Sequence, residues 1–356
     1  MHRGSSLVAA TLLLLTTAGP ASGAPALPRE RALDSGLLSP LSIAVAEDGT
    51  VWYSENYAGL LHRRGRDGRT TTPARAPGDL ELSAVGERDG TVWYAVTGAG
   101  HTIGRLHRLS PDGSDVVEAD LYAHERSENP DRGYRYGFDR LPPGCRAQVA
   151  GADRAAYRGK AETHPVASLP AHGAVYVADA AANAVLAVVD GTVTTVVALP
   201  PVRTTMTSAY AEENGFPACT VGRAYWAEAV PTDVEAGPLG RLYVTSLPGG
   251  PGELDGRPAG RILEVLPLTG QVRVLADGLD QPVGLAVAAS GDVYVSELQG
   301  DRISLVRAGT RTPESYVEVT YPGDVEHAPD GLVATTDVLS GTNGIDPPEG
   351  ELVKLN

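Results

Sequence analysis

The sequence is poor in aromatic residues, sulfur and positive charge. Aromatic residues make up 5% of its 356 positions, and it has only two Cys and two Met. Basic residues number 29 against 44 acidic ones, for a formal net charge of −15 at pH 7. Because such a charge repels a phosphate backbone, nucleic acid is not expected as a partner. Glycine and proline are abundant instead, at 42 and 27 residues, which favours short strands and tight turns over a mostly helical chain.

Long hydrophobic runs are also missing. The most apolar segment, residues 7–18, follows Arg3 and precedes small residues at 21–24. A transmembrane helix needs about 20 apolar residues, whereas a shorter run between a basic start and small residues is typical of a cleaved signal peptide. The sequence therefore predicts a signal peptide over residues 1–24, a single domain over residues 25–356, no membrane span, and a secreted or extracytoplasmic location.

A repeated pattern occupies most of the remaining sequence. Each unit has an apolar burst, a turn with glycine and an alternating strand, as in SPLSIAVAEDGTVWYSE from Ser39 and QPVGLAVAASGDVYVSE from Gln281. A second hairpin follows each unit, which gives four strands per repeat at a spacing of roughly 40 residues. Such units are typical of propeller blades, so the sequence predicts an all-β, six-bladed β-propeller. The units begin at Ser39, Leu80, His164, Val230, Gln281 and Tyr321.

The two ends of the chain complement each other in this scheme. The sixth unit ends after its third strand, GELVKLN, and lacks a fourth. The segment RALDSGLLSP from Arg31 aligns without gaps on RVLADGLDQP from Arg273, the fourth strand of the fourth unit. We therefore expect an N-terminal strand to complete the last blade and close the ring, which hides the edges that an open sheet would expose.

Two insertions interrupt the repeats, at about residues 123–163 and 201–229. Both lie in connections between blades, which share one face of a propeller, so we expect them to cover that face. Loops of this length are usually functional or covering. Each insertion holds one of the two cysteines, and an exported chain with two cysteines usually forms one disulfide. We therefore expect a bond between Cys145 and Cys219.

The insertions are also rich in aromatic residues. One interpretation is an aromatic-lined pocket for a flat, apolar ligand at the mouth of the channel. The other is that a cover outside the blades needs a hydrophobic core of its own, because aromatic side chains bury the most area per residue. The sequence leaves both open. The candidate ligand-cover residues are Tyr134, Tyr136, Phe138, Tyr210, Phe216, Tyr225 and Trp226.

The strongest polar signal is the sequence DVE, which occurs at the same place in the fourth and sixth units. Asp233 and Asp324 lie at the start of an innermost strand, at the mouth of the channel, and Glu235 and Glu326 follow two residues later. Paired carboxylates there can hold a divalent cation such as calcium, with Asp233 and Asp324 as ligands, or act as a general base. The alternative is a solvated or backbone-capping carboxylate at a strand entry.

His164 is the remaining candidate at the channel mouth. It opens the third unit beside the first insertion and could carry a proton, although a lone histidine is more often packed or capping. The sequence has no GxSxG, HExxH, P-loop or EF-hand motif. Catalytic residues are therefore not assigned, and no cofactor is predicted beyond the optional divalent cation.

Two longer segments carry a family resemblance: HPVASLPAHGAVYVADAAANAVLAVVDG from His164 and GFPACTVGRAYWAEAVPTDVEAGPLGRLYVTSLPGGP from Gly215. The chain resembles the ScyD/ScyE family of exported bacterial propellers, and NHL-repeat propellers more broadly. The resemblance covers about residues 37–356, with both insertions and both cysteines. It implies a secreted six-bladed propeller and carries over no catalytic residue.

Three functions are compatible with the sequence. The first is a secreted propeller that binds a small aromatic molecule, a glycan or a protein segment at its covered channel mouth. The second is a metal-assisted hydrolase similar to lactonases, or an enzyme that modifies a natural product, with Asp233 and Asp324 near the metal. The third is an interaction scaffold without a small-molecule site, in which the aromatic residues only form the core of the cover.

Overall fold

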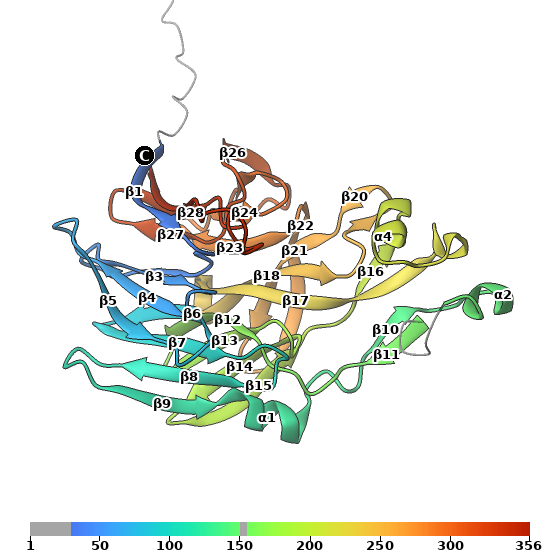
Figure 1. Ribbon diagram of the computed structural model, residues 1–356, viewed down its shortest axis with the longest axis horizontal. Helices are drawn as coiled ribbons and strands as arrows, with labels where there is room; N and C mark the ends of the chain where they lie inside the picture. Colours follow the sequence, from blue (N-terminus) through green and yellow to red (C-terminus); the bar gives the residue numbers. More distant parts are fainter. Residues whose placement is uncertain (1–29, 150–154) are drawn as a thin grey trace, which may run out of the picture.

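The structure is a computed structural model that describes residues 30–149 and 155–356. The described residues form five sheets of four strands, one of seven and one of two. In Figure 1 the sheets follow one another in chain order, from blue through green and yellow to red. The fold is therefore an all-β propeller, as the repeats predict. The predicted signal peptide, residues 1–24, lies outside the described residues.

Four of the four-stranded sheets are antiparallel meanders of consecutive strands. Each turn between their first two strands contains a glycine with a positive φ. This backbone conformation favours glycine and explains why glycine recurs in the repeats. The strands are β2 (Ile43–Val45), β3 (Val51–Glu55), β4 (Leu60–Arg64) and β5 (Thr70–Arg75); β6 (Glu81–Arg88), β7 (Thr91–Thr97), β8 (Gly104–Leu109) and β9 (Asp115–Asp120); β12 (Pro165–Ala171), β13 (Ala174–Asp179), β14 (Ala184–Val189) and β15 (Thr192–Ala198); and β23 (Pro282–Val287), β24 (Val293–Glu297), β25 (Arg302–Val306) and β26 (Glu314–Glu318).

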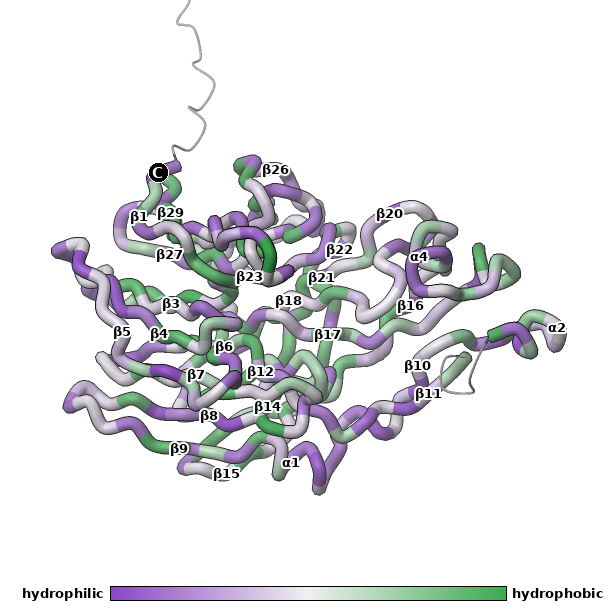
Figure 2. Tube along the Cα trace, viewed as in Figure 1, coloured by the Kyte–Doolittle hydropathy of each residue, from purple (hydrophilic) through white to green (hydrophobic). Residues whose placement is uncertain are grey.

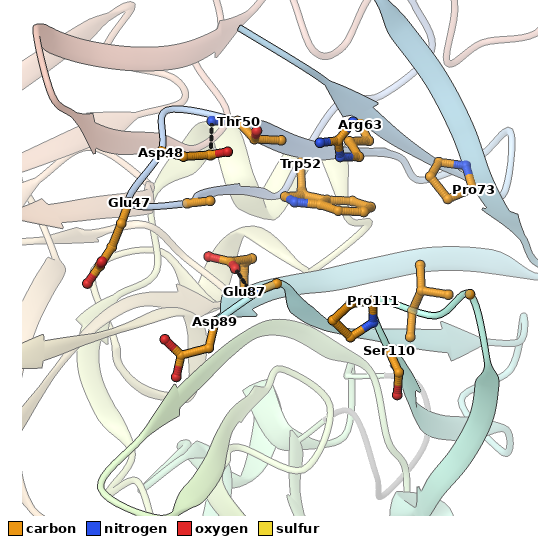
Figure 3. A pocket seen from close by; sticks show the side chains of 14 residues that line it. Glu47, Asp48, Thr50, Trp52, Arg63, Pro73, Glu87, Asp89, Ser110 and Pro111 are labelled. Atoms are coloured by element: carbon orange, nitrogen blue, oxygen red, sulfur yellow. Dashed lines mark hydrogen bonds between the residues drawn. The ribbon is translucent and has the colours of Figure 1, made fainter.

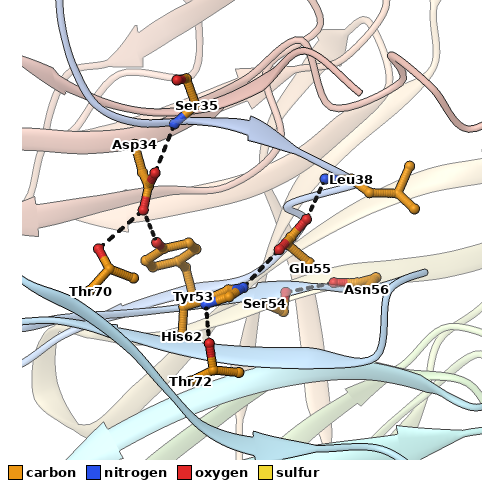
Figure 4. Close-up of polar contacts among 10 residues, drawn as sticks. All are labelled: Asp34, Ser35, Leu38, Tyr53, Ser54, Glu55, Asn56, His62, Thr70 and Thr72. Carbon is orange, nitrogen blue, oxygen red and sulfur yellow. Dashed lines mark hydrogen bonds and ion pairs between the residues drawn. The ribbon is translucent and has the colours of Figure 1, made fainter. Parts of the chain in front are cut away.

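The fifth four-stranded sheet contains both ends of the described chain. Strand β1 (Glu30–Leu37) pairs antiparallel with β29 (Gly350–Leu355), beside β28 (Gly331–Thr336) and β27 (Val325–Ala328). Asp34 of β1 also accepts hydrogen bonds from the hydroxyls of Tyr53, at 2.5 Å, and Thr70, at 3.1 Å, on the next sheet (Figure 4). The N-terminal strand is thus fastened to two sheets.

The sequence predicts six four-stranded blades, whereas the structure shows five. The repeat from Val230 belongs to the seven-stranded sheet, since its inner strand β17 (Ala224–Gly237) begins before the repeat and runs for 14 residues. The early part of β17 pairs with strands of the two insertions, which widens this sheet. The other strands are β10 (Arg135–Phe138), β11 (Ala156–Arg158), β16 (Val202–Thr205), β18 (Arg241–Gly249), β21 (Gly260–Leu266) and β22 (Gln271–Leu279), with β19 (Glu253–Leu254) and β20 (Arg257–Pro258) as a separate pair.

The short helices lie mainly in the insertions. The sequence favours a helix from Thr204 to Asn214, whereas α4 begins at Ser208, because the residues before it pair with β17 as strand β16. The Thr207 side chain accepts the Tyr210 N–H and so caps α4. In Figure 1, β10, β11 and α2 project outward at the right. The helices are α1 (Leu121–Glu128), α2 (Pro143–Arg146), α4 (Ser208–Glu213) and the 3-10 turns η1 (Ala218–Thr220) and η2 (Pro238–Gly240).

Hydrophobic clusters pack between consecutive sheets. Leu61 and Leu82 belong to one cluster and join the sheet of β2–β5 to that of β6–β9. Another cluster, with Tyr53 and Leu352, joins the sheet that contains β1 to the sheet of β2–β5. Figure 2 shows the same hydrophobic segments along the strands and hydrophilic turns between them. Because each fully buried leucine stabilises the fold by about 2 kcal/mol, these contacts hold the sheets against one another.

Candidate functional site

The four acids of the two DVE sequences lie together on the innermost strands. Asp233 and Glu235 belong to β17, Asp324 precedes β27, and Glu326 lies on β27. Strand β23 contacts both β17 and β27. The Asp324 carboxylate interacts electrostatically with Asp233 and Glu235, and the side chains of Glu235 and Glu326 are hydrogen bonded to each other. We refer to Asp233, Glu235, Asp324 and Glu326 as the inner-strand acids.

The two aspartates each bind backbone N–H groups of two strands. Asp233 accepts hydrogen bonds from Val234, at 2.7 Å, and from Leu285 on β23, also at 2.7 Å. Asp324 accepts from Val325 at 2.8 Å and from Ile43 on β2 at 2.7 Å. Both side chains are 5% exposed. Each aspartate therefore links its own sheet to the next one, and both of its oxygens already have a donor.

Other units use smaller residues at the same position. The Ser42 hydroxyl accepts the Val85 N–H at 2.8 Å, and the Ser83 hydroxyl donates to the Pro165 carbonyl at 2.7 Å. In β23 the position is Gly284, where a Cβ would lie 2.6 Å from the Asp324 carboxylate. The absence of a side chain at Gly284 thus leaves room for Asp324 beside β23. This position of the repeat serves contact between sheets, which is the capping interpretation that the sequence left open.

Burial controls the protonation of the inner-strand acids. It raises the pKa of Asp233 to about 7, although two backbone N–H groups oppose the shift. Burial and the nearby Asp233 charge raise the pKa of Glu235 to about 8. Burial and neighbouring carboxylates also hold the pKa values of Asp324 and Glu326 well above their usual range. The inner-strand acids therefore retain protons near neutral pH.

Among the inner-strand acids, Glu235 and Glu326 are the two that can exchange a proton or bind a charged group. Two carboxyl groups that bond to each other must share a proton, because two carboxylates have no donor between them. Both glutamates are partly exposed, whereas Asp233 and Asp324 are buried. This pair can give up or take a proton, or it can receive the positive charge of a bound group.

The structure does not add ligands to the proposed metal site at Asp233 and Asp324. Within the part of the chain that the structure describes, no three side chains of His, Cys, Asp or Glu are grouped as a metal site requires. The backbone donors of Asp233 and Asp324 also occupy the oxygens that a cation would need. The metal role of these two residues stays a prediction.

His164 lies apart from the inner-strand acids, between the second and third sheets. Its backbone N–H donates to Asp179 at 2.7 Å, and its ring lies 3.4 Å from the Glu81 carboxylate. The ring also stacks on His101, with centroids 5.1 Å apart. These contacts are those of a packed and capped histidine.

The aromatic residues of the insertions mostly contact one another. Phe138 packs edge-on against Phe216 and Tyr225, with ring centroids 5.9 and 5.1 Å apart, and Tyr210 stacks on Phe216. Tyr134 and Tyr136 bond through their hydroxyls to the Ala198 carbonyl and the Asp131 carboxylate, and Trp226 is 36% exposed. These contacts support the interpretation of a cover with its own core.

The predicted disulfide is confirmed. Cys145 of α2 and Cys219 of η1 are bonded, with Cα atoms 5.7 Å apart, and they join the two insertions. The bond closes a loop across 74 residues.

A pocket that the sequence analysis missed lies at the tight turns of the first two sheets (Figure 3). Its volume is about 580 Å³. The Arg63 guanidinium lies 5.8 Å from the centre of the Trp52 ring at this pocket. The signal was present in the acidic turns AEDG and ERDG of the first two units. The acids that line the pocket are Glu47, Asp48, Glu87 and Asp89.

Solved structures of other proteins share the fold of this chain. A streptogramin B lyase matches with a TM-score of 0.51 and 16% identity, over 92% of this chain and 97% of that one. A gluconolactonase from Xanthomonas campestris matches with a TM-score of 0.54 and 12% identity, over 92% and 90%. Regucalcin, a calcium-binding protein from Agrobacterium tumefaciens, matches with a TM-score of 0.50 and 14% identity, over 92% and 95%.

At these identities the likeness establishes the fold and nothing more. No family model matches the chain, and no curated protein matches it. None of the helices in residues 30–149 and 155–356 has the length and apolar character that a membrane crossing requires.

Proposed function

We propose that this chain is an exported propeller that binds a small molecule through a positively charged group, which the inner-strand acids receive in the central channel. The observation that carries the proposal is the meeting of four carboxyl groups from β17, from β27 and from Asp324 just before β27. No Lys, Arg or His among the described residues contributes to their pKa shifts. Buried carboxylates without a counter-charge are costly, so a bound cation gains a strong electrostatic attraction.

The proposal includes a closed ring of six blades. In it the seven-stranded sheet supplies the fourth blade through β17, β18, β21 and β22, and β1 completes the last blade. Hydrophobic clusters between each pair of consecutive sheets support this arrangement. The insertions would then cover one face, and residues 25–356 would form one domain. Export through a signal peptide over residues 1–24 and membership of the ScyD/ScyE family are further parts of the proposal.

The charge of the ligand can be tested by calorimetry with the polyamine spermidine as the probe. An ammonium group donates three hydrogen bonds and would displace the protons that the inner-strand acids hold. We expect binding to release protons, so that the measured heat changes with the ionisation heat of the buffer. The double variant Glu235→Gln with Glu326→Gln should lose this binding.

The matched control is Glu212→Gln, which removes one exposed carboxylate from α4 and leaves the inner strands unchanged. It should bind spermidine as the wild type does. Equal binding by the wild type and the double variant, or no binding by either, would contradict the proposal.

A second candidate function is hydrolysis by acid–base catalysis, and the shared proton of Glu235 and Glu326 favours it. A carboxyl pair with raised pKa values can hold one proton for a leaving group and accept another from water. Glucono-1,5-lactone is a suitable probe. Loss of hydrolysis in Glu326→Gln, with the fold retained, would support an enzyme, and elemental analysis of the wild type and of Asp233→Ala with Asp324→Ala would test the metal-assisted form.

The other ligands that the sequence suggests can be separated by the same variants. A glycan or protein segment would bind outside the channel, at an insertion surface such as that around the exposed Trp226. Its binding would quench tryptophan fluorescence and persist in the Glu235→Gln, Glu326→Gln double variant. A scaffold with no small-molecule site would bind no small molecule in either protein.

A further inference from the structure

A second group of polar side chains is buried where the first insertion leaves the sheets. Helix α1 follows β9 directly and contacts β8 and β15. The tube around α1 is strongly hydrophilic in Figure 2. Nevertheless Glu125, in the middle of α1, is 0% exposed, and neither of its carboxylate oxygens has a hydrogen-bond partner within residues 30–149 and 155–356. A buried carboxylate without any partner is rare in a folded protein and calls for a missing ligand or a proton.

Three further residues near Glu125 also have a buried side-chain oxygen without a hydrogen-bond partner. Asp131 and Asn183 are each 1% exposed, and one side-chain oxygen of each is buried without a partner. The side-chain oxygen of Asn129 is also buried without a partner. All of these unpartnered atoms are carboxyl or amide oxygens. We refer to Glu125, Asn129, Asp131 and Asn183 as the α1 cluster.

The amide N–H₂ groups of Asn183 and Asn129 in the α1 cluster already donate hydrogen bonds. These bonds fix the orientation of the amide oxygens. The Asn183 amide donates to the second oxygen of Asp131 at 2.9 Å, and the Tyr136 hydroxyl donates to the same oxygen at 2.9 Å. The Asn129 amide donates to the Gly159 carbonyl at 3.3 Å. Each amide thus has its N–H₂ engaged and its oxygen left over.

These contacts also bring the cluster together from distant parts of the sequence. A Cβ at Gly159 would collide with the Asp131 carboxylate, so that the chain around Asn129, Asp131 and Gly159 is tightly packed. The Glu125 charge interacts with Asp131 and with Asp179. Asp179 itself is satisfied, because His164, Ala182 and Thr163 donate to its two oxygens.

None of the groups that shift the pKa values of Glu125 and Asp131 is a Lys, Arg or His of the described residues. Burial, together with Asp179 and Asp131, raises the pKa of Glu125 to about 9. The charged form of Glu125 thus lacks a compensating partner among the described residues.

We propose that Glu125, Asn129, Asp131 and Asn183 bind a calcium ion, which fastens the first insertion to the sheet of β12–β15. Carboxylate and amide oxygens are ligands of a hard cation, and the cluster has neither Cys nor His to favour a transition metal. Calcium accepts six to eight oxygens in flexible geometry, and a bidentate glutamate is common among its ligands. Magnesium requires a strict octahedron and retains water, which suits a dry cluster less well.

Calcium binding can be measured on the mature chain after treatment with EDTA. We expect calcium chloride at a hundredfold excess over its dissociation constant to raise Tm by roughly 5 °C, and magnesium chloride to raise it much less. Glu125→Gln and Asp131→Asn keep the shape of the side chains and remove one charge each. Each should weaken calcium binding by about tenfold or more, because the charge count of the ligands sets the affinity.

Terbium gives a local readout of the same site. The Tyr136 hydroxyl contacts Asp131, so a terbium ion in the α1 cluster would be excited through the Tyr136 ring. Calcium should displace the terbium and remove its emission. Tyr136→Phe should reduce the emission while leaving the calcium effect on Tm largely in place.

The matched control is Glu128→Gln, which removes an exposed carboxylate from the last turn of the same helix. It should respond to calcium as the wild type does. The proposal is overturned by an absent response in the wild type, by equal responses in Glu125→Gln and Glu128→Gln, or by equal shifts with magnesium. Loss of the response only in Glu235→Gln with Glu326→Gln would place the ion at the inner-strand acids and overturn it as well.

Discussion

The aspartates of the inner-strand acids and the acids of the α1 cluster are buried, and no basic side chain of the described residues shifts their pKa values, but their oxygens have different hydrogen-bond partners. Asp233 and Asp324 receive backbone N–H groups from neighbouring strands. Glu125 receives none, although it is more deeply buried. The first group lies on the repeat, where every blade offers an inner-strand N–H at a fixed place. The second lies where an irregular insertion meets the sheets and no such donor exists, so a different partner is needed there.

The largest effect is expected from breaking the insertions while leaving the repeat intact. Cys145→Ser with Cys219→Ser opens a loop across 74 residues, which lowers stability by about 4 kcal/mol on a loop-entropy estimate. We expect limited proteolysis to cut both insertions in this variant, while circular dichroism shows unchanged strand content. Global unfolding at room temperature would show that the sheets depend on the insertions.

Removal of an inter-sheet carboxylate should have the next largest effect. Asp324→Ala leaves the N–H groups of Ile43 and Val325 buried without acceptors, and we expect a loss of about 3 kcal/mol in the free energy of unfolding. Asp324→Asn keeps one acceptor and should lose about 1 kcal/mol. Urea denaturation measures both. Equal stability of wild type and Asp324→Ala would exclude the structural role assigned to this residue.

The protons of the inner-strand acids predict how stability changes with pH. Glu235 has a pKa near 4.3 when unfolded, and burial raises it to about 8 in the folded chain. The folded state then binds more protons, so stability is greatest below about pH 4 for this group and falls as pH rises to about 8, by up to about 5 kcal/mol. The difference between wild type and Glu235→Gln with Glu326→Gln isolates this contribution. A rise in that difference with pH would contradict the shifts.

The smallest expected effect is that of Glu125→Gln on stability, and it distinguishes the α1 cluster from the inner-strand acids. In EDTA, Glu125→Gln removes a buried carboxyl that lacks a partner and should stabilise the chain by about 1 kcal/mol. In saturating calcium the order should reverse, because only the wild type retains the charged ligand. The control Glu128→Gln should show neither change. Thermal denaturation with and without calcium gives the comparison directly.

Local periodicity explains which features the sequence could predict. The alternation of apolar residues and the turn glycines are read within about 20 residues, so the strands, the propeller fold and the N-terminal strand beside β29 follow from them. The pairing of Cys145 with Cys219 followed from the small number of cysteines. The extended β17 did not follow, because its first half is paired by β10 and β16, and strand pairing between insertions leaves no periodic signal.

By itself the sequence determined that the repeats form blades, that the insertions interrupt them, and that DVE stands at two equivalent positions. Only the tertiary structure decided that the DVE acids meet beside Gly284, that the Ile43 N–H occupies Asp324 from 281 residues away, and that Glu125 is buried without a partner. The physical reason is that secondary structure depends on neighbours along the chain. The partners of a buried carboxylate come instead from whichever segments the fold brings beside it, and these decide whether it is a link between sheets or a site.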